Sequence, residues 1–499
     1  MDWIVRSMTH LRCLCLFCGL FLFAAPVRAG WLPDGTPLCT FPGDQHIGRA
    51  VSDGSQGTIV VWSDNRSDAG TDIYAQRVDI NGNALWTPEG VAVCTAAGSQ
   101  YNPRLTSDGA GGAVIAWLDA SSGQNDIYAQ RIDASGHVLW AINGVAVSTE
   151  TGNQISPTLV PDGGGGAIIA WQDYRSGTNY DIYAQRIAGS NGAQLWAAGG
   201  REICVAAGSQ YYPEAVSDGT GGAIIAWHDY RGGNYDIYAQ HVNTAGVRLW
   251  TIDGVAVTVA ANNQVYPKVT SDGAGGAIIA WHDYRSGSNY DVYAQRMTSG
   301  GTASWTANGV AVSTATNSQS DPQLISDGAG GAIITWQDGR GSDNDIYTQR
   351  VNSAGTPLWT ANGVLVCGMA GAQSRPALAS DGSGGAIIVW EDYRPGGSSD
   401  IYAQKIASTG VVQWSATGIA ISSAYGYQEI AQIVSDNFGG AIIAWQDGRG
   451  GTFYDIYAGH VDGDGNAGWT NCGVPISTAA SHQTGVRIVS DGYEGAIMA

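Results

Sequence analysis

The chain is 499 residues long, carries a formal net charge of −20 at pH 7 and contains 72 glycines. An acidic chain of this kind lacks the basic footprint through which proteins bind nucleic acid or anionic membranes. We therefore predict no nucleic-acid partner, and we expect the glycines to serve tight turns.

Residues 1–29 have the pattern of an export signal. Arg6 and Arg12 precede an apolar stretch over residues 13–25, and residues 27–29 (Val-Arg-Ala) place small residues where a signal peptidase cuts. The alternative is a membrane anchor, but the apolar stretch is shorter than the ~20 residues that span a bilayer. The sequence thus predicts cleavage near Ala29, no membrane span, and a secreted, periplasmic or cell-surface protein with one domain over residues 30–499.

A repeat with a step of 54 to 56 residues fills that domain. Each copy opens with an Asp followed by Gly or Asn, and in the first eight copies a Trp stands nine residues later. The triplet Asp-Ile/Val-Tyr follows, and then a second Trp and a short apolar segment such as residues 145–147. The opening residues are Asp53, Asp108, Asp162, Asp218, Asp272, Asp327, Asp381 and Asp436, and a partial repeat opens at Asp491.

The copy that opens at Asp162 illustrates how strands form. Residues 166–171 (Gly-Ala-Ile-Ile-Ala-Trp) are an apolar run typical of a strand buried on both faces. Residues 181–187 alternate as a period-two strand, and the turn residues between the two segments predict a hairpin. A short first strand at 158–160 and a fourth strand complete a four-stranded unit, which is the content of a propeller blade.

We therefore predict an all-β chain that forms one β-propeller disc, with eight four-stranded blades and a partial further repeat at the C-terminal end. Residues 36–39 match the fourth strand of a copy, which indicates that strands from both ends close the ring. Closure with eight or with nine blades is left open, because the partial repeat leads us to expect further sequence after Ala499.

Four segments of this copy resemble the TolB-type, WD-like β-propeller repeat. They are Pro157-x-x-x-x-Asp-Gly, the apolar strand that ends at Trp171, residues 173–177 (Asp-x-Arg-x-Gly) and residues 181–183 (Asp-Ile-Tyr). The match covers half of each copy; the copies here are longer, and their second Trp is not part of that pattern. The resemblance implies an extracytoplasmic propeller of a kind that often docks other proteins, and it brings over no catalytic residue.

Five cysteines follow the export signal: Cys39, Cys94, Cys204, Cys367 and Cys472. The first four share the position after a short apolar strand, where other copies carry Ser or Thr. Equivalent positions in different blades are too far apart to form a bridge, so we predict small packing residues rather than a disulfide framework.

An arginine stands two residues after an Asp in every copy but the second, which has Ser121. A sialidase-like enzyme would use clustered arginines to hold a carboxylate, but a catalytic residue has no reason to recur in nearly every blade. We predict structural clamps on an Asp or a loop carbonyl, either the Asp of Asp-Ile-Tyr or the Asp two residues earlier. The clamp residues are Arg66, Arg175, Arg231, Arg285, Arg340, Arg394 and Arg449.

Two motifs invite a metal interpretation. His228 and His282 follow a Trp in adjacent copies, and residues 462–466 (Asp-Gly-Asp-Gly-Asn) approach an EF-hand loop. The spacing of blades separates the histidines, and the loop lacks the Gly and Glu that calcium loops carry at positions six and twelve. We predict an ordinary turn at 462–466, and neither a metal nor a cofactor.

Function is expected where the copies differ, in the loops after the fourth strand and between the second and third strands. Tyrosines concentrate in these loops, which should share one face. Such a face suits binding to protein or polysaccharide, and the alternative is that the rings only cover blade edges. The candidate ligand-binding residues are Tyr174, Tyr211, Tyr212, Tyr230, Tyr266, Tyr284 and Tyr393.

Together these patterns predict a monomeric, non-enzymatic, secreted propeller that binds or displays protein or polysaccharide. No nucleophile elbow, phosphate loop or zinc-protease motif occurs in the sequence. The alternative is a sialidase-like propeller glycoside hydrolase, which would need two non-repeating acids in one pocket. Glu214 and Glu391 are non-repeating acids, but they occupy different copies.

Overall fold

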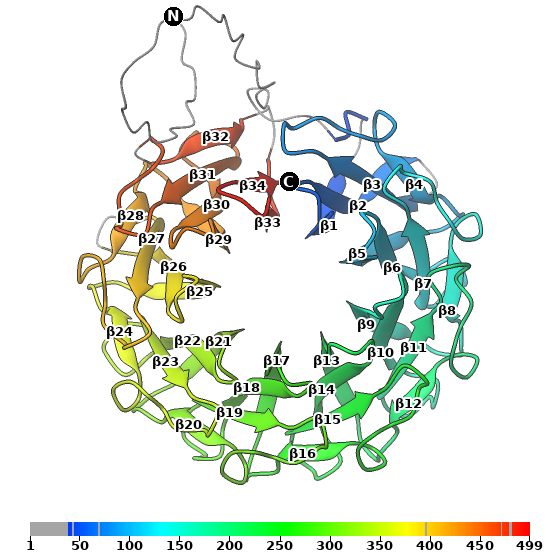
Figure 1. Ribbon diagram of the computed structural model, residues 1–499, viewed down its shortest axis with the longest axis horizontal. Coiled ribbons are helices and arrows are strands. Elements are labelled where there is room, and N and C mark those ends of the chain that lie inside the picture. Colours follow the sequence, from blue (N-terminus) through cyan, green and yellow to red (C-terminus); the bar gives the residue numbers. More distant parts are fainter. Residues whose placement is uncertain (1–37, 42–43, 68–69, 395–396, 471, 479–481) are drawn as a thin grey trace, which may run out of the picture.

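The computed structural model describes residues 38–499 apart from 42–43, 68–69, 395–396, 471 and 479–481. Eight antiparallel sheets of four strands each stand around a common centre, and a two-stranded sheet follows the eighth (Figure 1). The prediction of an eight-bladed propeller with a partial further repeat is confirmed. The expected export signal lies outside the described residues. Among the residues that are described, no helix is long and apolar enough to cross a membrane.

Each blade is a meander whose first strand is innermost and whose fourth is outermost, so that blade 1 is β1–β4 and blade 8 is β29–β32 (Figure 1). The first strands are β1 (Gln45–Ser52), β5 (Gln100–Ser107), β9 (Gln154–Pro161), β13 (Gln210–Ser217), β17 (Gln264–Ser271), β21 (Gln319–Ser326), β25 (Gln373–Ser380) and β29 (Gln428–Ser435). The second strands are β2 (Thr58–Ser67), β6 (Ala113–Asp119), β10 (Ala167–Asp173), β14 (Ala223–Asp229), β18 (Ala277–Asp283), β22 (Ala332–Asp338), β26 (Ala386–Asp392) and β30 (Ala441–Asp447).

The outer strands complete the sheets. The third strands are β3 (Gly70–Val78), β7 (Asp126–Ile132), β11 (Asp181–Ile187), β15 (Asp236–Val242), β19 (Asp291–Met297), β23 (Asp345–Val351), β27 (Asp400–Ile406) and β31 (Asp455–Val461). The fourth strands are β4 (Val91–Cys94), β8 (Val145–Ser148), β12 (Arg201–Cys204), β16 (Val255–Thr258), β20 (Val310–Ser313), β24 (Val364–Cys367), β28 (Ile419–Ser422) and β32 (Val474–Ser477). The two-stranded sheet is β33 (Ile488–Ser490) and β34 (Ala496–Met498).

The core lies between blades, around the second strands. Every residue of β10 is buried. Ile169 and Trp171 pack against blade 2, whereas Ile168 and Ala170 pack against blade 4, because successive side chains of a strand point to opposite faces. Tyr183 of β11 stacks on Trp171 with ring centroids 6.4 Å apart. The wedges between blades are therefore filled by the rings that the repeat supplies, as predicted.

The first strands are longer than the short segment predicted at 158–160. β9 begins at Gln154, whose buried side-chain amide donates to the carbonyls of Glu150 and Gly152 at 3.0 and 2.7 Å. The register of β9 against β10 shifts in the same stretch, and Ser156 adopts a positive φ of 55°. The apolar pattern missed this half of the strand because it is polar and bulged.

The first and last described segments of the chain share one further sector of the ring. β33 contacts both β29 of blade 8 and β1 of blade 1 (Figure 1). On the outer side, Arg66 Nη2 lies 3.0 Å from Cys39 Sγ, which repeats the 3.0 Å contact of Arg231 with Cys204 in the preceding blade. Cys39 thus occupies the fourth-strand position of the sector whose inner strands are β33 and β34.

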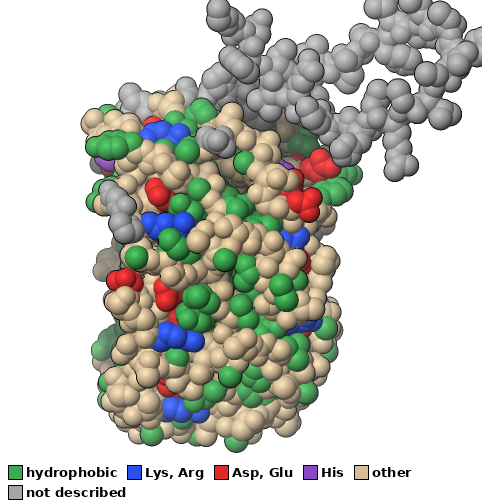
Figure 2. Space-filling view, turned by 90° about the vertical axis from the view of Figure 1, so that its left-hand side faces the viewer, with side chains coloured by type: hydrophobic (Ala, Val, Ile, Leu, Met, Phe, Trp, Pro, Cys, Tyr) green, Lys and Arg blue, Asp and Glu red, His purple; other side chains and the backbone are tan. Residues whose placement is uncertain are grey.

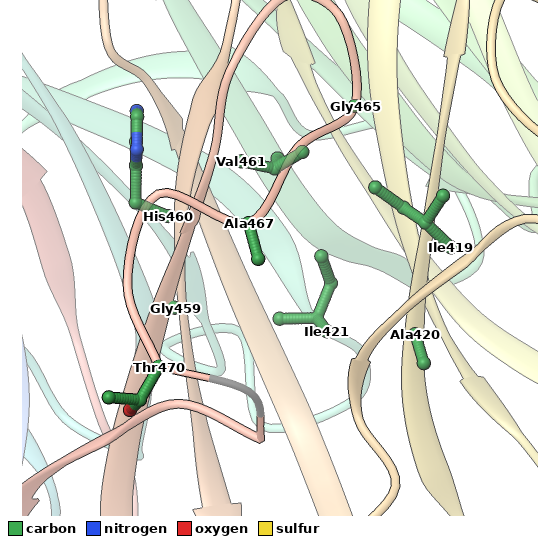
Figure 3. A pocket seen from close by; sticks show the side chains of 9 residues that line it. All are labelled: Ile419, Ala420, Ile421, Gly459, His460, Val461, Gly465, Ala467 and Thr470. Atoms are coloured by element: carbon green, nitrogen blue, oxygen red, sulfur yellow. The ribbon is translucent and has the colours of Figure 1, made fainter.

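A small cavity marks a defect in the repeat of blade 8. In blade 6, Gln349 of the third strand donates to the Thr360 carbonyl and accepts the N–H groups of Trp359 and Arg350. Blade 8 has Gly459 at this position, and a cavity of about 60 Å³ lies there, lined by Ile419, Ile421 and Ala467 among others (Figure 3). Ligand pockets typically measure 300–1,000 Å³. We therefore interpret this space as the volume left by the missing Gln side chain and not as a binding site.

We expect Gly459→Gln to stabilise the protein by about 1–2 kcal/mol, because it fills the cavity and restores a buried hydrogen-bonding group. The new Cβ would lie 3.0 Å from Cγ2 of Ile421, so that side chain must shift by a few tenths of an ångström. The urea midpoint of unfolding should rise, while the matched change Gln349→Gly in blade 6 should lower it. A lowered midpoint for Gly459→Gln would contradict this account of the cavity.

Candidate ligand-binding site

The recurrent arginines lie in or next to the loops between second and third strands, and each bonds an Asp at or near the end of the second strand and the loop before the fourth strand. Arg175 pairs with the Asp two residues earlier: its Nη2 lies 2.6 Å from Asp173 Oδ2, and its Nε donates to Oδ1 at 2.9 Å. The same guanidinium donates to the Gly199 carbonyl at 2.7 Å and lies 3.7 Å from the centroid of the Tyr183 ring. The same ion pair and ring contact recur at Arg66, Arg231, Arg285, Arg340, Arg394 and Arg449.

The Asp of this pair also accepts a hydrogen bond from the buried Trp. Trp171 Nε1 donates to Asp173 Oδ2 at 2.7 Å. In blade 2, where Ser121 replaces the Arg, the buried Trp117 Nε1 has no partner among the described residues. The other candidate acid, Asp181, bonds Asn179 instead. The arginine therefore orients the carboxylate that accepts the indole N–H of the buried Trp in its blade.

Eleven aromatic rings form a continuous row over blades 3, 4 and 5, which we call the aromatic strip. Ring centroids are 4.9 Å apart for Tyr174 and Tyr180, 5.7 Å for Tyr180 and Tyr211, and 5.7 Å for Tyr212 and Tyr266. The full set is Tyr174, Tyr180, Tyr211, Tyr212, His228, Tyr230, Tyr235, Tyr266, His282, Tyr284 and Tyr290.

Two features of the backbone direct the strip outward. Tyr212 and Tyr266 occupy bulges of β13 and β17, with positive φ angles of 52° and 55°. Their exposed fractions are both 51%, so the bulge presents each ring to solvent. The hairpin loops and the loops after the fourth strands meet at this face. For example, the N–H of Tyr174, in the hairpin loop of blade 3, donates to the carbonyl of Asn153, in the loop after β8, at 2.9 Å.

A hydrogen bond between blades holds each bulge. The Tyr212 N–H donates to Gln172 Oε1 of the preceding blade at 2.6 Å, and the Tyr266 N–H donates to His228 Nδ1 at 3.3 Å. His282 accepts the N–H of Asp321 through Nε2 in the same way, at 3.1 Å. In blades 3, 4 and 5 the residue after the buried Trp therefore acts as a latch on the next blade, and the two latch histidines must be neutral at the nitrogen that accepts.

Burial supports the neutral form of both latch histidines. Burial lowers the pKa of His228 and of His282 to about 4. The same cause raises the pKa of Tyr180 and Tyr290, so these phenols keep their protons at neutral pH. Within the described residues no group of three or more His, Cys, Asp and Glu side chains is arranged to hold a metal ion.

Six of the seven predicted tyrosines belong to the strip, and Tyr393 does not. Tyr393 lies in blade 7, where its hydroxyl bonds Glu391 at 3.2 Å. Sequence reasoning missed Tyr180, Tyr235 and Tyr290, which precede Asp-Ile/Val-Tyr in blades 3, 4 and 5. The available signal was the concentration of Tyr at several repeat positions in three consecutive copies.

The non-repeating acids Glu214 and Glu391 lie in different blades. Glu391 is 1% exposed in its side chain, pairs with Arg375 at 3.1 Å and accepts the Ile430 N–H at 2.7 Å. Glu214 belongs to blade 4 and pairs with Lys268 at 3.6 Å. These two carboxylates therefore do not form the facing pair that glycoside hydrolysis requires.

Other predicted features fall into structural roles. None of the five cysteines is in a disulfide. Asp462 accepts the N–H groups of Asp464 and Asn466. In the equivalent turn of blade 2, Asp133 accepts the N–H groups of Ser135 and His137, so residues 462–466 form an ordinary turn. On the side of the ring that faces the viewer in Figure 2, basic and acidic side chains lie dispersed among neutral ones.

No family model and no curated protein matches the chain. Solved structures resemble it in fold. A eukaryotic initiation factor is 8% identical over 87% of this chain and 90% of its own, with a TM-score of 0.47. The polysaccharide lyase Uly1 is 9% identical over 77% and 95%, with a TM-score of 0.41. A putative TolB from Agrobacterium tumefaciens is 18% identical over 53% and 81%, with a TM-score of 0.29.

Removing a clamp should destabilise the domain. We expect Arg175→Ala to cost about 1–3 kcal/mol, because the buried Asp173 carboxylate loses its charged donor. The converse change Ser121→Arg in blade 2 should raise stability, since it supplies the missing partner and reorients Asp119 toward Trp117. Both variants can be melted beside the wild type. An unchanged midpoint for Arg175→Ala, together with loss of binding to a glycan or protein, would make these arginines functional instead.

We expect the stability difference between wild type and a variant that lacks a latch histidine to depend on pH. The folded pKa of His228 is about 4, below the ordinary 6.5, so the unfolded chain takes up the proton first as the pH falls. Wild type should therefore lose up to about 3 kcal/mol of stability between pH 6.5 and pH 4 relative to His228→Gln, which keeps an acceptor as in blade 3.

Buried carboxyls such as Asp181, whose pKa is raised to about 6, act in the opposite direction. These carboxyls are present in both wild type and His228→Gln, so their contribution to the pH dependence of stability cancels when the two proteins are compared. The measurement is urea unfolding across this pH range, and the exposed His137→Gln is the control. Parallel stability curves for His228→Gln and wild type would refute the neutral latch.

Proposed function

We propose that the chain is a non-enzymatic, extracytoplasmic scaffold that binds a polysaccharide or protein through the aromatic strip. The observation that supports it is the strip itself: eleven rings in contact, at positions where the copies differ. The residues shared by all or nearly all blades are already used within the fold, as the buried Trp residues and the clamps illustrate.

The strip suits an extended ligand. Its rings cross three blades on an open face, and Tyr212, Tyr230 and Tyr266 are between 43% and 51% exposed. Tyrosine offers a flat apolar surface together with a polar hydroxyl, and it loses little conformational entropy when a ligand covers it. Because the rings form a surface and not a deep pocket, a polymer chain laid across the blades fits better than a small molecule.

The test is binding of soluble polysaccharides, measured by affinity electrophoresis and then by calorimetry on any that bind. We expect Tyr212→Ala and Tyr266→Ala each to weaken binding about tenfold or more, the loss typical of a central aromatic contact. Tyr425→Ala is the matched control, because this residue is 87% exposed, lies in the loop between blades 7 and 8 and is outside the strip.

The outcomes separate the alternatives. Tyr212-dependent retention of a polysaccharide without release of new reducing ends supports the scaffold. Release of reducing ends would favour the glycoside hydrolase. If no polysaccharide binds but a purified protein partner depends on Tyr212 and Tyr266, then the ligand is a protein. Binding that is equally strong in both strip variants would overturn the assignment of the strip.

A further inference from the structure

Three arginines occupy one repeat position in consecutive sectors of the ring. Arg487, Arg49 and Arg104 each stand four residues before an opening Asp, in the β33 sector, blade 1 and blade 2. β1 contacts both β33 and β5, so these inner segments are neighbours (Figure 1). Around the rest of the ring the same position holds Thr158, Glu214, Lys268, Gln323, Ala377 and Gln432.

These arginines lack the acidic partners that the other repeated arginines have. Within the described part of the chain, the guanidinium groups of Arg49 and Arg104 make no ion pair or hydrogen bond. Arg487 donates only to the carbonyls of Gly485 and Val486, at 3.2 and 2.9 Å. By contrast Arg131, in the same blade as Arg104, pairs with Asp108 at 2.7 Å.

The three positive charges act on one another. Burial, with Arg49 and Arg487 beside it, lowers the pKa of Arg104 to about 10. Burial and Arg49 also lower the pKa of Arg487. The one acid that acts on Arg104 is Glu214, which is already paired with Lys268. A cluster of uncompensated arginines is unusual in a chain with a net charge of −20.

We propose that Arg49, Arg104 and Arg487 form a binding site for an oxyanion (sulfate, phosphate or carboxylate) at the inner edge of the ring. The planar guanidinium group donates two parallel hydrogen bonds to such oxygens, and a shared anion would offset the repulsion among the three cations. The oxyanion is either a free ion or a group carried by an acidic polymer. This site is distinct from the aromatic strip, which lies on blades 3–5, and does not depend on it.

The test compares thermal unfolding of the full chain in sodium sulfate and in sodium chloride of equal ionic strength. Because a ligand that binds only the folded state raises its melting temperature, wild type should melt higher in sulfate. Arg104→Gln should lose most of that increment. Lys405→Gln is the control, because it removes a cation that bonds, among the described residues, only the carbonyls of Gly439 and Gly463. This variant should keep the increment, which includes any general effect of sulfate on folded proteins.

Arg49→Gln, at an exposed residue, serves as the second variant if Arg104→Gln does not fold. Titration with dextran sulfate and polygalacturonate distinguishes the two sources. Binding about tenfold or more tighter than that of sulfate indicates a polymer-borne group, and similar binding indicates a free ion. An equal sulfate increment in Arg104→Gln, Arg49→Gln and Lys405→Gln would overturn the site.

Discussion

The packing of one blade's second strand against the second strands of its two neighbours is the contact on which the rest of this structure depends. A strand such as β10 is apolar on both faces, so a single blade would leave both of those faces in water. The surface is buried only when each blade has a neighbour on either side, which a closed ring provides. This requirement explains why β33 and Cys39, from opposite ends of the described chain, occupy one sector.

The copies that break the repeat reveal what its residues do. Ser121 in place of Arg leaves the Trp117 indole without a partner, and Gly459 in place of Gln leaves a cavity. His241 shows the reverse case. It stands where blade 1 has Arg77 and reproduces both contacts of that residue, one to an Asp carboxylate and one to a carbonyl of the next blade. The fold therefore depends on the contact rather than on the residue type.

The same reasoning separates the candidate binding features from the structural ones. Residues that recur in nearly every blade, such as Arg175, make contacts that hold the blades together. Residues confined to a few consecutive blades are not needed for folding in the remaining blades. They gather at two places: the tyrosines on one face of blades 3–5 and the arginines at the inner edge near β1. A bulge held by a hydrogen bond to the preceding blade presents two of these rings, Tyr212 and Tyr266, to solvent.

The amino-acid sequence by itself determined the blade. Its repeat length, the apolar run before Trp171 and the alternation of residues 181–187 are local properties, and local backbone preferences translate them directly into strands. Only the tertiary structure decided how blades are joined. The choice of Asp173 over Asp181 as the partner of Arg175, the latch from His228 to Tyr266 and the polar half of β9 all depend on loops brought together by packing. The aromatic strip belongs to the same class, because its rings are separated in sequence and meet only when three blades stand side by side.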